Sequence, residues 1–531
     1  MPPATAFRIV DNVETVARPA AAGSILSENA AARRHRLTTE SAIKGFFGSN
    51  ALVAVVVLAL ITIFLFREGF GFFGQNLANL RLYRRAGLEY VDIIRTQAQT
   101  HAALSRQLGE IRLQEARTFP SSGSLQVFDQ FAAAFSDSGE FLNALVSDAN
   151  DQALALREAL IAADTPSAVS SAEGEAPMAA AAPVDPRVAM TGLRSVDNKF
   201  PTIATAMKAK IDDLLAAPPL LNASRAQRLF ESWKKRTRDY LAQFPAVSQQ
   251  LHEWNPDKRV PAYRAVTSFL FGTNWITASF WQDWYGIIPL LVGSIMVAAV
   301  ALLIAVPLGV CSAIYVSEVA ARGEKSLIKP YIEFISAIPS VVLGFFGIAV
   351  VGQAVRALSQ MPFMKWVPFF PISERLNVFT AGSLLALMAV PTIFTLAEDA
   401  LRNVPRGFKE ASYALGANRL QTIARVLVPA SLSGIISAVL LGLGRVIGET
   451  MVVLLCAGNR IAIPDFTQGL GAFFQPVHTM TGIIGQEMGE VVRGSIHYRA
   501  LFMVGLVLFV LTLGINYLAQ RLVARYRMSI G

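Results

Sequence analysis

The stretch Leu432–Cys456 reads LSGIISAVLLGLGRVIGETMVVLLC and decides the fold class. It is long enough to cross the roughly 30 Å hydrocarbon core of a bilayer as one helix. Its only charged residues are Arg445 and Glu449. A charge at membrane depth costs about 3 kcal/mol unless it faces protein or water. The stretch therefore predicts a membrane helix whose charged residues face something other than lipid.

Five further apolar runs have the length and composition of membrane helices. The first, ALVAVVVLALITIFLF (Ala51–Phe66), follows a polar tail over 1–49 that is too long for a cleavable signal. We expect an anchor helix at 50–66. The other four are expected at Ile287–Tyr315, Ile332–Ala354, Val378–Leu396 and Ala500–Leu518. The chain is thus predicted to be an all-α membrane protein with six transmembrane helices.

The composition agrees with a multi-pass membrane protein. The chain is 53% hydrophobic and 16% charged, and its mean hydropathy is +0.44, which is too apolar for a soluble globule. The net charge is +9, and much of the basic excess flanks apolar runs, as the positive-inside rule requires. This distribution argues against a nucleic-acid partner. Basic residues follow the last run, at Arg521, Arg525 and Arg527. We expect a protein of the cell inner (plasma) membrane, in contact with lipid, with both termini in the cytoplasm.

A long polar segment over 67–284 separates the first two apolar runs. It contains helix-like stretches at Leu88–Arg117, Leu125–Ala163 and Ser195–Phe244, and it lacks the alternation typical of strands. Residues 165–186 are rich in Pro, Ser and Ala, which is typical of a disordered hinge. The segment is predicted to be a mostly helical extracytoplasmic insertion.

No catalytic or metal-binding motif is recognisable. The chain lacks GxxxxGK[ST], HExxH, GxSxG and CxxC patterns, and Cys311 and Cys456 lack the spacing of metal ligands. The scattered histidines are expected to be solvated; they are His101, His252, His478 and His497. The sequence predicts no enzyme, no metal and no ATP hydrolysis by this chain alone.

The cytoplasmic loop expected at 402–429 has a definite pattern. Its core, GFKEASYALGANRLQTIARVLVPASLSG (Gly407–Gly434), should open with a short helix at Lys409–Tyr413. Small Ala411 and Ser412 would allow a partner surface to approach closely. Gly416 suits a turn that needs a positive φ, and Pro429 fits the first turn of the next helix.

This loop resembles the EAA loop of ABC importer permeases. That pattern has Glu-Ala-Ala, a glycine after three residues, and I-x-L-P after nine more; here Ser412, Val426 and Val428 are conservative replacements. The resemblance implies that the positions Glu410, Ala411, Ser412 and Gly416 dock onto a separate ATPase subunit and transmit its closure.

Three other stretches resemble the phosphate-specific (Pst) permeases, and the run GRxxGETM is nearer their PstC-type subunit. They are IAVPLGVCSAIYVSE (Ile304–Glu318), ISAIPSVVLGFFG (Ile335–Gly347) and LGLGRVIGETM (Leu441–Met451). The resemblance covers a permease domain at 285–525 but not the insertion. It implies phosphate import by alternating access, as a heterodimer with a PstA-type sister permease. It also implies a PstB-type ATPase dimer that uses ATP-Mg and a PstS-type extracytoplasmic phosphate-binding protein. No cofactor is expected in this chain.

Arg445 and Glu449 are four residues apart, so on one helix they would share a face and neutralise each other. One interpretation is an internal ion pair in a packing helix. Apolar residues would avoid the desolvation penalty, however, and Gly444 and Gly448 leave space beside the helix. Our hypothesis is that Arg445, with Glu449 and Thr450 beside it, lines the path and receives phosphate, while Glu449 holds the arginine in the empty site. The resemblance points the same way.

Two prolines lie inside expected membrane helices. Pro339 and Pro391 remove backbone hydrogen bonds and are expected to kink their helices. The kinks would serve either gating or ordinary packing.

Other functions remain open from the sequence. An importer for another oxyanion, such as sulfate or molybdate, fits the same features. A membrane receptor that senses through the insertion would not need six spans and an ATPase-docking loop. A secondary transporter is disfavoured because the spans show no pair of internal halves.

Overall fold

The computed structural model describes residues 22–526, except 120–122, 165–185, 365 and 368. The chain divides into two units, Met1–Arg67 and Glu68–Gly531, and each is treated by itself. The start of the polar tail, nearly all of the expected hinge at 165–186, and Arg527 lie outside the described residues. The first unit consists, in its described part, of the N-terminal portion of helix α1 (Ala22–Arg85).

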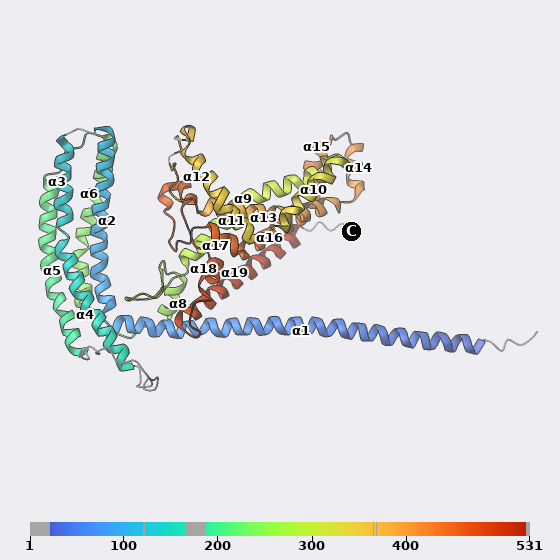
Figure 1. Ribbon diagram of the computed structural model, residues 1–531, viewed down its shortest axis with the longest axis horizontal. Coiled ribbons are helices and arrows are strands. Elements are labelled where there is room, and N and C mark those ends of the chain that lie inside the picture. The colour runs from blue at the N-terminus through green and yellow to red at the C-terminus, as the bar shows by residue number, and fades with distance from the viewer. Residues whose placement is uncertain (1–21, 120–122, 165–185, 365, 368, 527–531) are drawn as a thin grey trace, which may run out of the picture. The chain divides into compact units, whose positions relative to one another are not determined.

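Six helices of the described part are long and apolar enough to cross a membrane, which confirms the expected number and the all-α membrane class. They span Ile43–Arg85, Ile288–Val319, Ser340–Gln360, Val378–Arg402, Arg419–Gly448 and Ile496–Arg521. Figure 1 shows the last five gathered into one helical body. The only β-strands of the described residues form a two-stranded antiparallel pair, β1 (Trp275–Ile276) and β2 (Trp284–Tyr285), in which Trp275 pairs with Tyr285.

The membrane body is built from helices and short helical turns. In chain order they are α8 (Tyr263–Leu270), α9 (Ile288–Ile314), η1 (Tyr315–Val319), α10 (Arg322–Ala337), α11 (Ser340–Phe346), η2 (Gly347–Val351), α12 (Gly352–Gln360), η3 (Pro362–Met364), α13 (Val378–Arg402), α14 (Arg406–Ala414), α15 (Arg419–Thr422), η4 (Ile423–Leu427), α16 (Val428–Gly448), α17 (Met451–Cys456), η5 (Phe466–Phe474), α18 (Met480–Glu487) and α19 (Ile496–Tyr526). The elements η1, η2 and η4 are π-helical turns.

Helix α13 is the centre of this body and packs between α9 and α16 (Figure 1). Small residues on both neighbours allow this close packing. A Cβ on Gly309 of α9 would lie 2.8 Å from Ile393 Cγ2, and one on Gly442 of α16 would lie 2.7 Å from Ile393 Cγ1. Ile393 itself is fully buried. Gly309 and Gly442 therefore serve helix packing.

The expected start of the helix at Ile332–Ala354 is wrong. Helix α10 ends at Ala337, and α11 begins at Ser340. Ile338 and Pro339 are extended, with ψ of 124° and 138°, because a residue before proline avoids the helical region. Pro339 thus separates two helices instead of kinking one. Pro391 does lie inside α13, where its effect on the helix axis stays a prediction.

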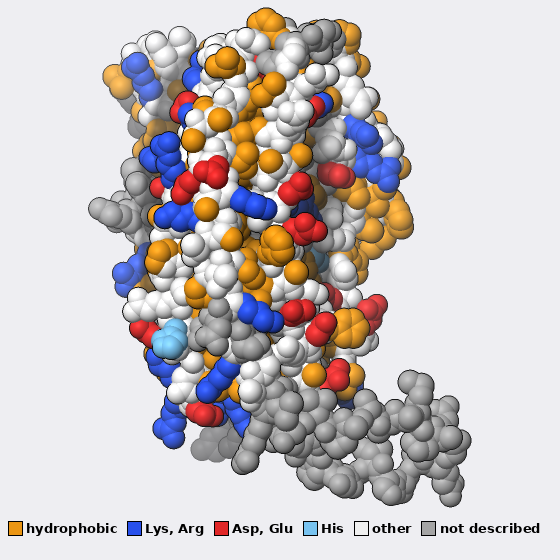
Figure 2. Space-filling model, turned by 90° about the vertical axis from the view of Figure 1, so that its left-hand side faces the viewer, with side chains coloured by type: hydrophobic (Ala, Val, Ile, Leu, Met, Phe, Trp, Pro, Cys, Tyr) orange, Lys and Arg blue, Asp and Glu red, His pale blue; other side chains and the backbone are white. Residues whose placement is uncertain are grey.

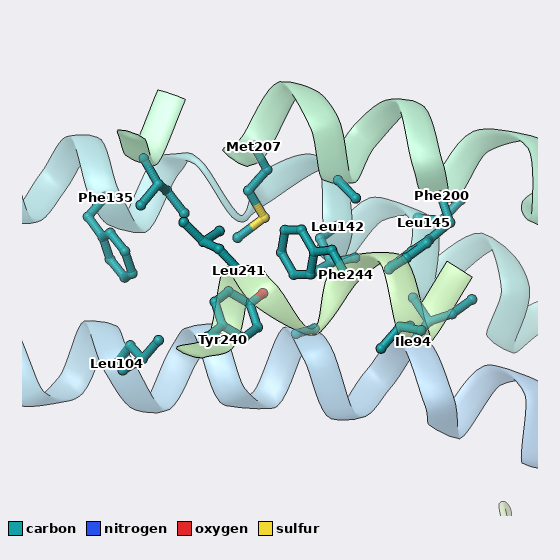
Figure 3. Close-up of a cluster of buried hydrophobic side chains, with 14 of the residues drawn as sticks. Ile94, Leu104, Phe135, Leu142, Leu145, Phe200, Met207, Tyr240, Leu241 and Phe244 are labelled. Atoms are coloured by element: carbon teal, nitrogen blue, oxygen red, sulfur yellow. The ribbon is translucent and has the colours of Figure 1, made fainter. Parts of the chain in front are cut away.

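The insertion is a helical bundle, as expected. Its helices are α2 (Leu88–Thr118), α3 (Gly123–Asp137), α4 (Glu140–Asp164), α5 (Pro186–Ala216), α6 (Ser224–Ala242) and α7 (Phe244–His252). Aromatic side chains fill the core, and Trp233, Phe128 and Phe135 are at most 1% exposed. Figure 3 shows Tyr240 and Phe244 between Ile94 and Leu104 of α2 on one side and Leu142 and Met207 on the other.

Two of the helices expected in the insertion are each divided in the structure. The stretch Leu125–Ala163 breaks near Ser138, because Gly139 lies against His101; a Cβ there would be 2.2 Å from His101 Cδ2. The stretch Ser195–Phe244 breaks after Ala216, where two consecutive prolines, Pro218 and Pro219, follow. Both breaks let the helices fold back against α2.

The expectation of solvated histidines is wrong for two of them. His101 is 4% exposed and His478 is 1% exposed. The His101 ring stacks on Phe135 at 4.6 Å between centroids, and burial lowers the pKa of His101. Both side chains are thus neutral packing elements. No three His, Cys, Asp or Glu side chains of the described residues could hold a metal ion together.

A buried carboxylate caps helix α6 from a distant part of the insertion. Glu115 of α2 is fully buried and accepts hydrogen bonds from the backbone N–H groups of Asn222 (2.8 Å) and Ala223 (2.9 Å). The first turn of α6 has no side-chain cap of its own. A carboxylate from α2 therefore satisfies N–H groups that would otherwise lack an intrahelical partner.

We expect Glu115→Ala to loosen the start of α6. Loss of hydrogen bonds to a charged acceptor should lower local stability by about 2 kcal/mol. Hydrogen exchange of the full chain would show faster exchange of the α6 amides, while Glu110→Ala, at an exposed position of α2, should leave them unchanged. Equal exchange in both variants would contradict the capping role.

Candidate transport path and coupling loop

The stretch Leu432–Cys456 belongs to two helices with a break between them. Helix α16 ends at Gly448, Glu449 is extended with ψ of 130°, and α17 begins at Met451. The expected single helix over Leu432–Cys456 is therefore wrong. Arg445 lies in the last turn of α16, where the partial negative charge of the helix end stabilises a cation.

Arg445 reaches across to α13. Its Nη1 donates to Thr392 Oγ1 at 3.0 Å, and Thr392 directly follows Pro391 inside α13. The hydroxyl holds the guanidinium without cancelling its charge. Sequence reasoning missed Thr392, although a hydroxyl residue beside an intrahelical proline was a visible signal.

Glu449 does not pair with Arg445, because the extended backbone turns its side chain away from the face of α16. Its Oε1 instead accepts from the backbone N–H groups of Met451 (3.1 Å) and Val452 (3.5 Å). No ion pair of the described residues joins Arg445 to Glu449. The interpretation of an internal ion pair and the hypothesis that Glu449 holds Arg445 are therefore both wrong, and Glu449 caps α17.

Helix α18 contacts the break between α16 and α17 and stabilises it. Thr481 Oγ1 donates to the backbone oxygen of Glu449 at 2.9 Å. Half-buried Thr450 is packed against the same helix, since a Cβ on Gly485 would lie 2.7 Å from Thr450 Cγ2. Thr481 is a further positioning residue, and nothing in the sequence marked it. The break is thus held in place by a contact from a distant segment.

The face of α16 that carries Arg445 is open. Arg445 is exposed, and a Cβ added at Gly444 or Gly448 would meet nothing within 4 Å. Leu441, one turn earlier, is 60% exposed. An exposed arginine on a membrane helix indicates that this part of the face meets protein or water instead of lipid.

The loop between α13 and α16 folds as the pattern predicted. Helix α14 contains Glu410 and Ala411, both exposed. Gly416 has a φ of +82°, which confirms the expected turn. Pro429 lies in the first turn of α16; the wide turn η4 directly precedes it and accommodates the missing N–H.

Ser412 differs from its expected role. It is buried, and its Oγ lies 2.9 Å from Thr422 Oγ1. This bond fastens α14 to α15, so Ser412 shapes the loop instead of facing a partner. The outer surface is apolar: Leu415 is 89% exposed, Leu420 73% and Tyr413 48%.

Two charge clusters lie beside this loop, and the first ties the loop to η1. Lys409 Nζ pairs with Glu318 Oε1 of η1 at 2.7 Å, and Arg419 donates to the Glu318 backbone oxygen. Fully buried Glu398 of α13 pairs with Lys329 of α10 at 2.9 Å and with Arg402 at 2.6 Å. A buried pair of this kind is costly to break. The loop is therefore fastened to η1, and α10 is fastened to α13.

We expect Gly416→Ala to strain the coupling loop. An L-residue in the left-handed region costs about 1–2 kcal/mol, although a Cβ there meets nothing within 4 Å. Uptake of labelled phosphate, the substrate that the resemblance implies, should fall severalfold. Gly407→Ala is the matched control, because Gly407 is in helix α14 with equally open surroundings. Equal uptake in the two variants would contradict the requirement for a positive φ.

The membrane body is similar in sequence to a known protein family. Residues 305–528 match the family described as the binding-protein-dependent transport system inner membrane component. The probable ABC transporter permease protein YqgH of Bacillus subtilis is 36% identical over 258 residues, covering 48% of this chain and 77% of that protein. The chain belongs to this permease family. It is a multi-pass membrane protein of the inner membrane that works with an ATPase and a binding protein.

Other relatives of the permease carry a more specific name. The phosphate transport system permease protein PstC of Haemophilus influenzae is 31% identical over 277 residues, covering 49% of this chain and 84% of that protein. The protein of the same name from Mesorhizobium japonicum is 30% identical, covering 49% of this chain and 81% of that protein. The family match begins at residue 305, beyond the insertion.

Proposed function

We propose that the permease is the PstC-type subunit of an ABC importer that moves inorganic phosphate into the cytoplasm by alternating access. The observation that carries this proposal is Arg445. Its guanidinium lies at a helix break and has no ion-pair partner among the described residues. Relatives named as phosphate transport system permeases support the choice of anion.

The geometry suits a passing oxyanion. A guanidinium offers a planar fork of donors that matches the oxygens of phosphate. Thr392 uses one donor nitrogen, and Glu449 is engaged with the N–H groups of α17. The positive charge of Arg445 is therefore available to an anion in this state. Glu449 and Thr450 would line the same break and keep the path from holding phosphate too tightly.

The partners belong to the same proposal. A PstB-type ATPase dimer would bind ATP-Mg and dock on the surface around Glu410, Ala411 and Gly416. A PstA-type sister subunit would cover the open face of α16, and a PstS-type binding protein would deliver phosphate on the outer side. Both termini would be cytoplasmic. The helix break at Pro339 and the proline of α13, Pro391, would be the points where the membrane helices bend.

Uptake of labelled phosphate tests the proposal. A strain lacking this chain should regain uptake when the chain is restored, and unlabelled phosphate should compete while sulfate and molybdate should not. Competition by sulfate or molybdate at equal concentration would instead indicate a permease for another oxyanion. Unchanged uptake, together with no co-purifying ATPase, would favour a membrane receptor and refute the proposal.

A further inference from the structure

Basic side chains converge where helix α1 ends and the chain returns from the insertion. Arg81 and Arg85 lie one turn apart on α1, and Lys258 and Arg259 lie on the loop between α7 and α8. All four side chains are exposed, and none has an ion-pair partner among the described residues. They line one side of a cavity of about 490 Å³, together with Asp257 as its only acid. We call this cavity the basic cradle.

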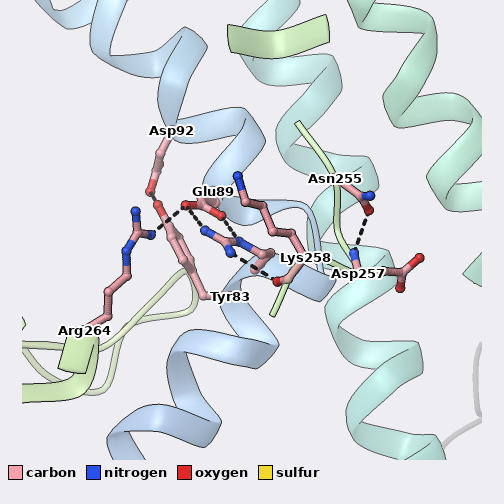
Figure 4. A network of polar contacts seen from close by, with 8 residues as sticks. Tyr83, Glu89, Asp92, Asn255, Asp257, Lys258 and Arg264 are labelled. Atoms are coloured by element: carbon pink, nitrogen blue, oxygen red, sulfur yellow. Dashed lines mark hydrogen bonds and ion pairs between the residues drawn. The ribbon is translucent and has the colours of Figure 1, made fainter. Parts of the chain in front are cut away.

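The cradle has a built wall. Arg84 pairs with Glu89 at 2.5 Å and donates from Nη1 to the backbone oxygen of Lys258 at 3.1 Å, which fixes the loop against α1. Arg264 adds a second contact to Glu89 at 3.4 Å (Figure 4). Glu89 thus pairs with both arginines, while the four outer cations have no acidic partner among the described residues.

Packing alone gives no reason for these cations. Like charges at positions i and i+4 of a helix, such as Arg81 and Arg85, are destabilising by about 0.2–0.5 kcal/mol. Elsewhere on the insertion, Lys and Arg side chains are interspersed with Asp and Glu (Figure 2). A concave group of one sign differs from that mixed surface and attracts anions.

The position of the cradle favours a free anion over a lipid headgroup. Phe72 of α1 packs on Tyr285 at 5.7 Å between ring centroids, and the membrane helix α9 begins three residues after Tyr285. Arg81 and Arg85 follow Phe72 by 9 and 13 positions, which is roughly 14 and 20 Å along the helix. The headgroup layer is only about 5–8 Å thick on each side.

We propose that the basic cradle binds a phosphoryl anion, either a free phosphate or pyrophosphate or the headgroup of an anionic lipid. The site does not depend on the transport function. Its four cations provide charge-assisted hydrogen bonds to phosphoryl oxygens. It is separate from Arg445, because Arg81 and Arg85 lie at the end of α1 and Lys258 and Arg259 on the loop before α8, whereas Arg445 lies on α16.

The test uses the full chain in nanodiscs of phosphatidylcholine, with equilibrium dialysis of labelled phosphate and pyrophosphate. Arg81→Gln with Arg85→Gln, and separately Lys258→Gln with Arg259→Gln, should weaken pyrophosphate binding at least about 10-fold. Arg236→Gln with Arg238→Gln removes the same charge from an exposed part of α6 and should have no effect. Uptake of labelled phosphate, measured in parallel, should be unchanged in both cradle variants, which separates the cradle from the transport path.

A second arm uses flotation with vesicles of phosphatidylglycerol and phosphatidylcholine. If only flotation depends on the cradle residues, the phosphoryl group comes from lipid and the site stands. The proposal is overturned if the wild-type chain and both cradle variants bind the labelled anions and the vesicles equally. It is also overturned if the wild-type chain binds neither the anions nor the vesicles.

Discussion

Arg445→Ala should abolish phosphate uptake while leaving the complex assembled. The variant removes the guanidinium at the break between α16 and α17 and leaves Thr392 without its donor. Loss of charge-assisted hydrogen bonds worth about 1.5–3 kcal/mol each should lower uptake at least about 100-fold. Labelled phosphate uptake measures the effect, and co-purification of the ATPase measures assembly.

Two further variants sharpen this test. Arg445→Lys keeps the charge but loses the planar fork of donors, so we expect an intermediate uptake. Arg356→Ala removes an exposed arginine from α12 and should leave uptake unchanged. Undiminished uptake by Arg445→Ala would show that phosphate takes a path that does not include this side chain.

Glu410→Lys should separate the permease from its ATPase. Glu410 is exposed on α14, beside the apolar surface formed by Tyr413, Leu415 and Leu420. A reversed charge at a docking surface repels its partner and costs several kcal/mol. The ATPase should no longer co-purify with the permease, and uptake should fall to background.

Asp399→Lys is the matched control for this charge reversal. Asp399 is an exposed acid on α13 that lies outside α14, so its reversal should leave both the co-purification and the uptake intact. Glu410→Gln should be intermediate, because it removes the attraction without adding repulsion. If Glu410→Lys still co-purifies and transports, the ATPase docks elsewhere.

These predictions combine features that the sequence showed with features that it could not show. Gly416 was recognisable because a positive φ is a local property of one residue, and the structure has it at +82°. The pairing of Arg445 with Glu449 was wrong because spacing along a helix holds only while the helix continues. Glu449 is extended, so four residues no longer bring two side chains to one face.

The sequence by itself determined the six apolar spans, the helical insertion and the shape of the coupling loop, because hydrophobic runs and turn residues act within a few residues of themselves. Only the tertiary structure decided which residues surround Arg445, why Ser412 is buried, and that Arg81 and Lys258 share one cavity. Each of these three features depends on contacts between segments that are far apart in the chain. Tertiary packing sets those contacts, and a local sequence pattern does not predict them.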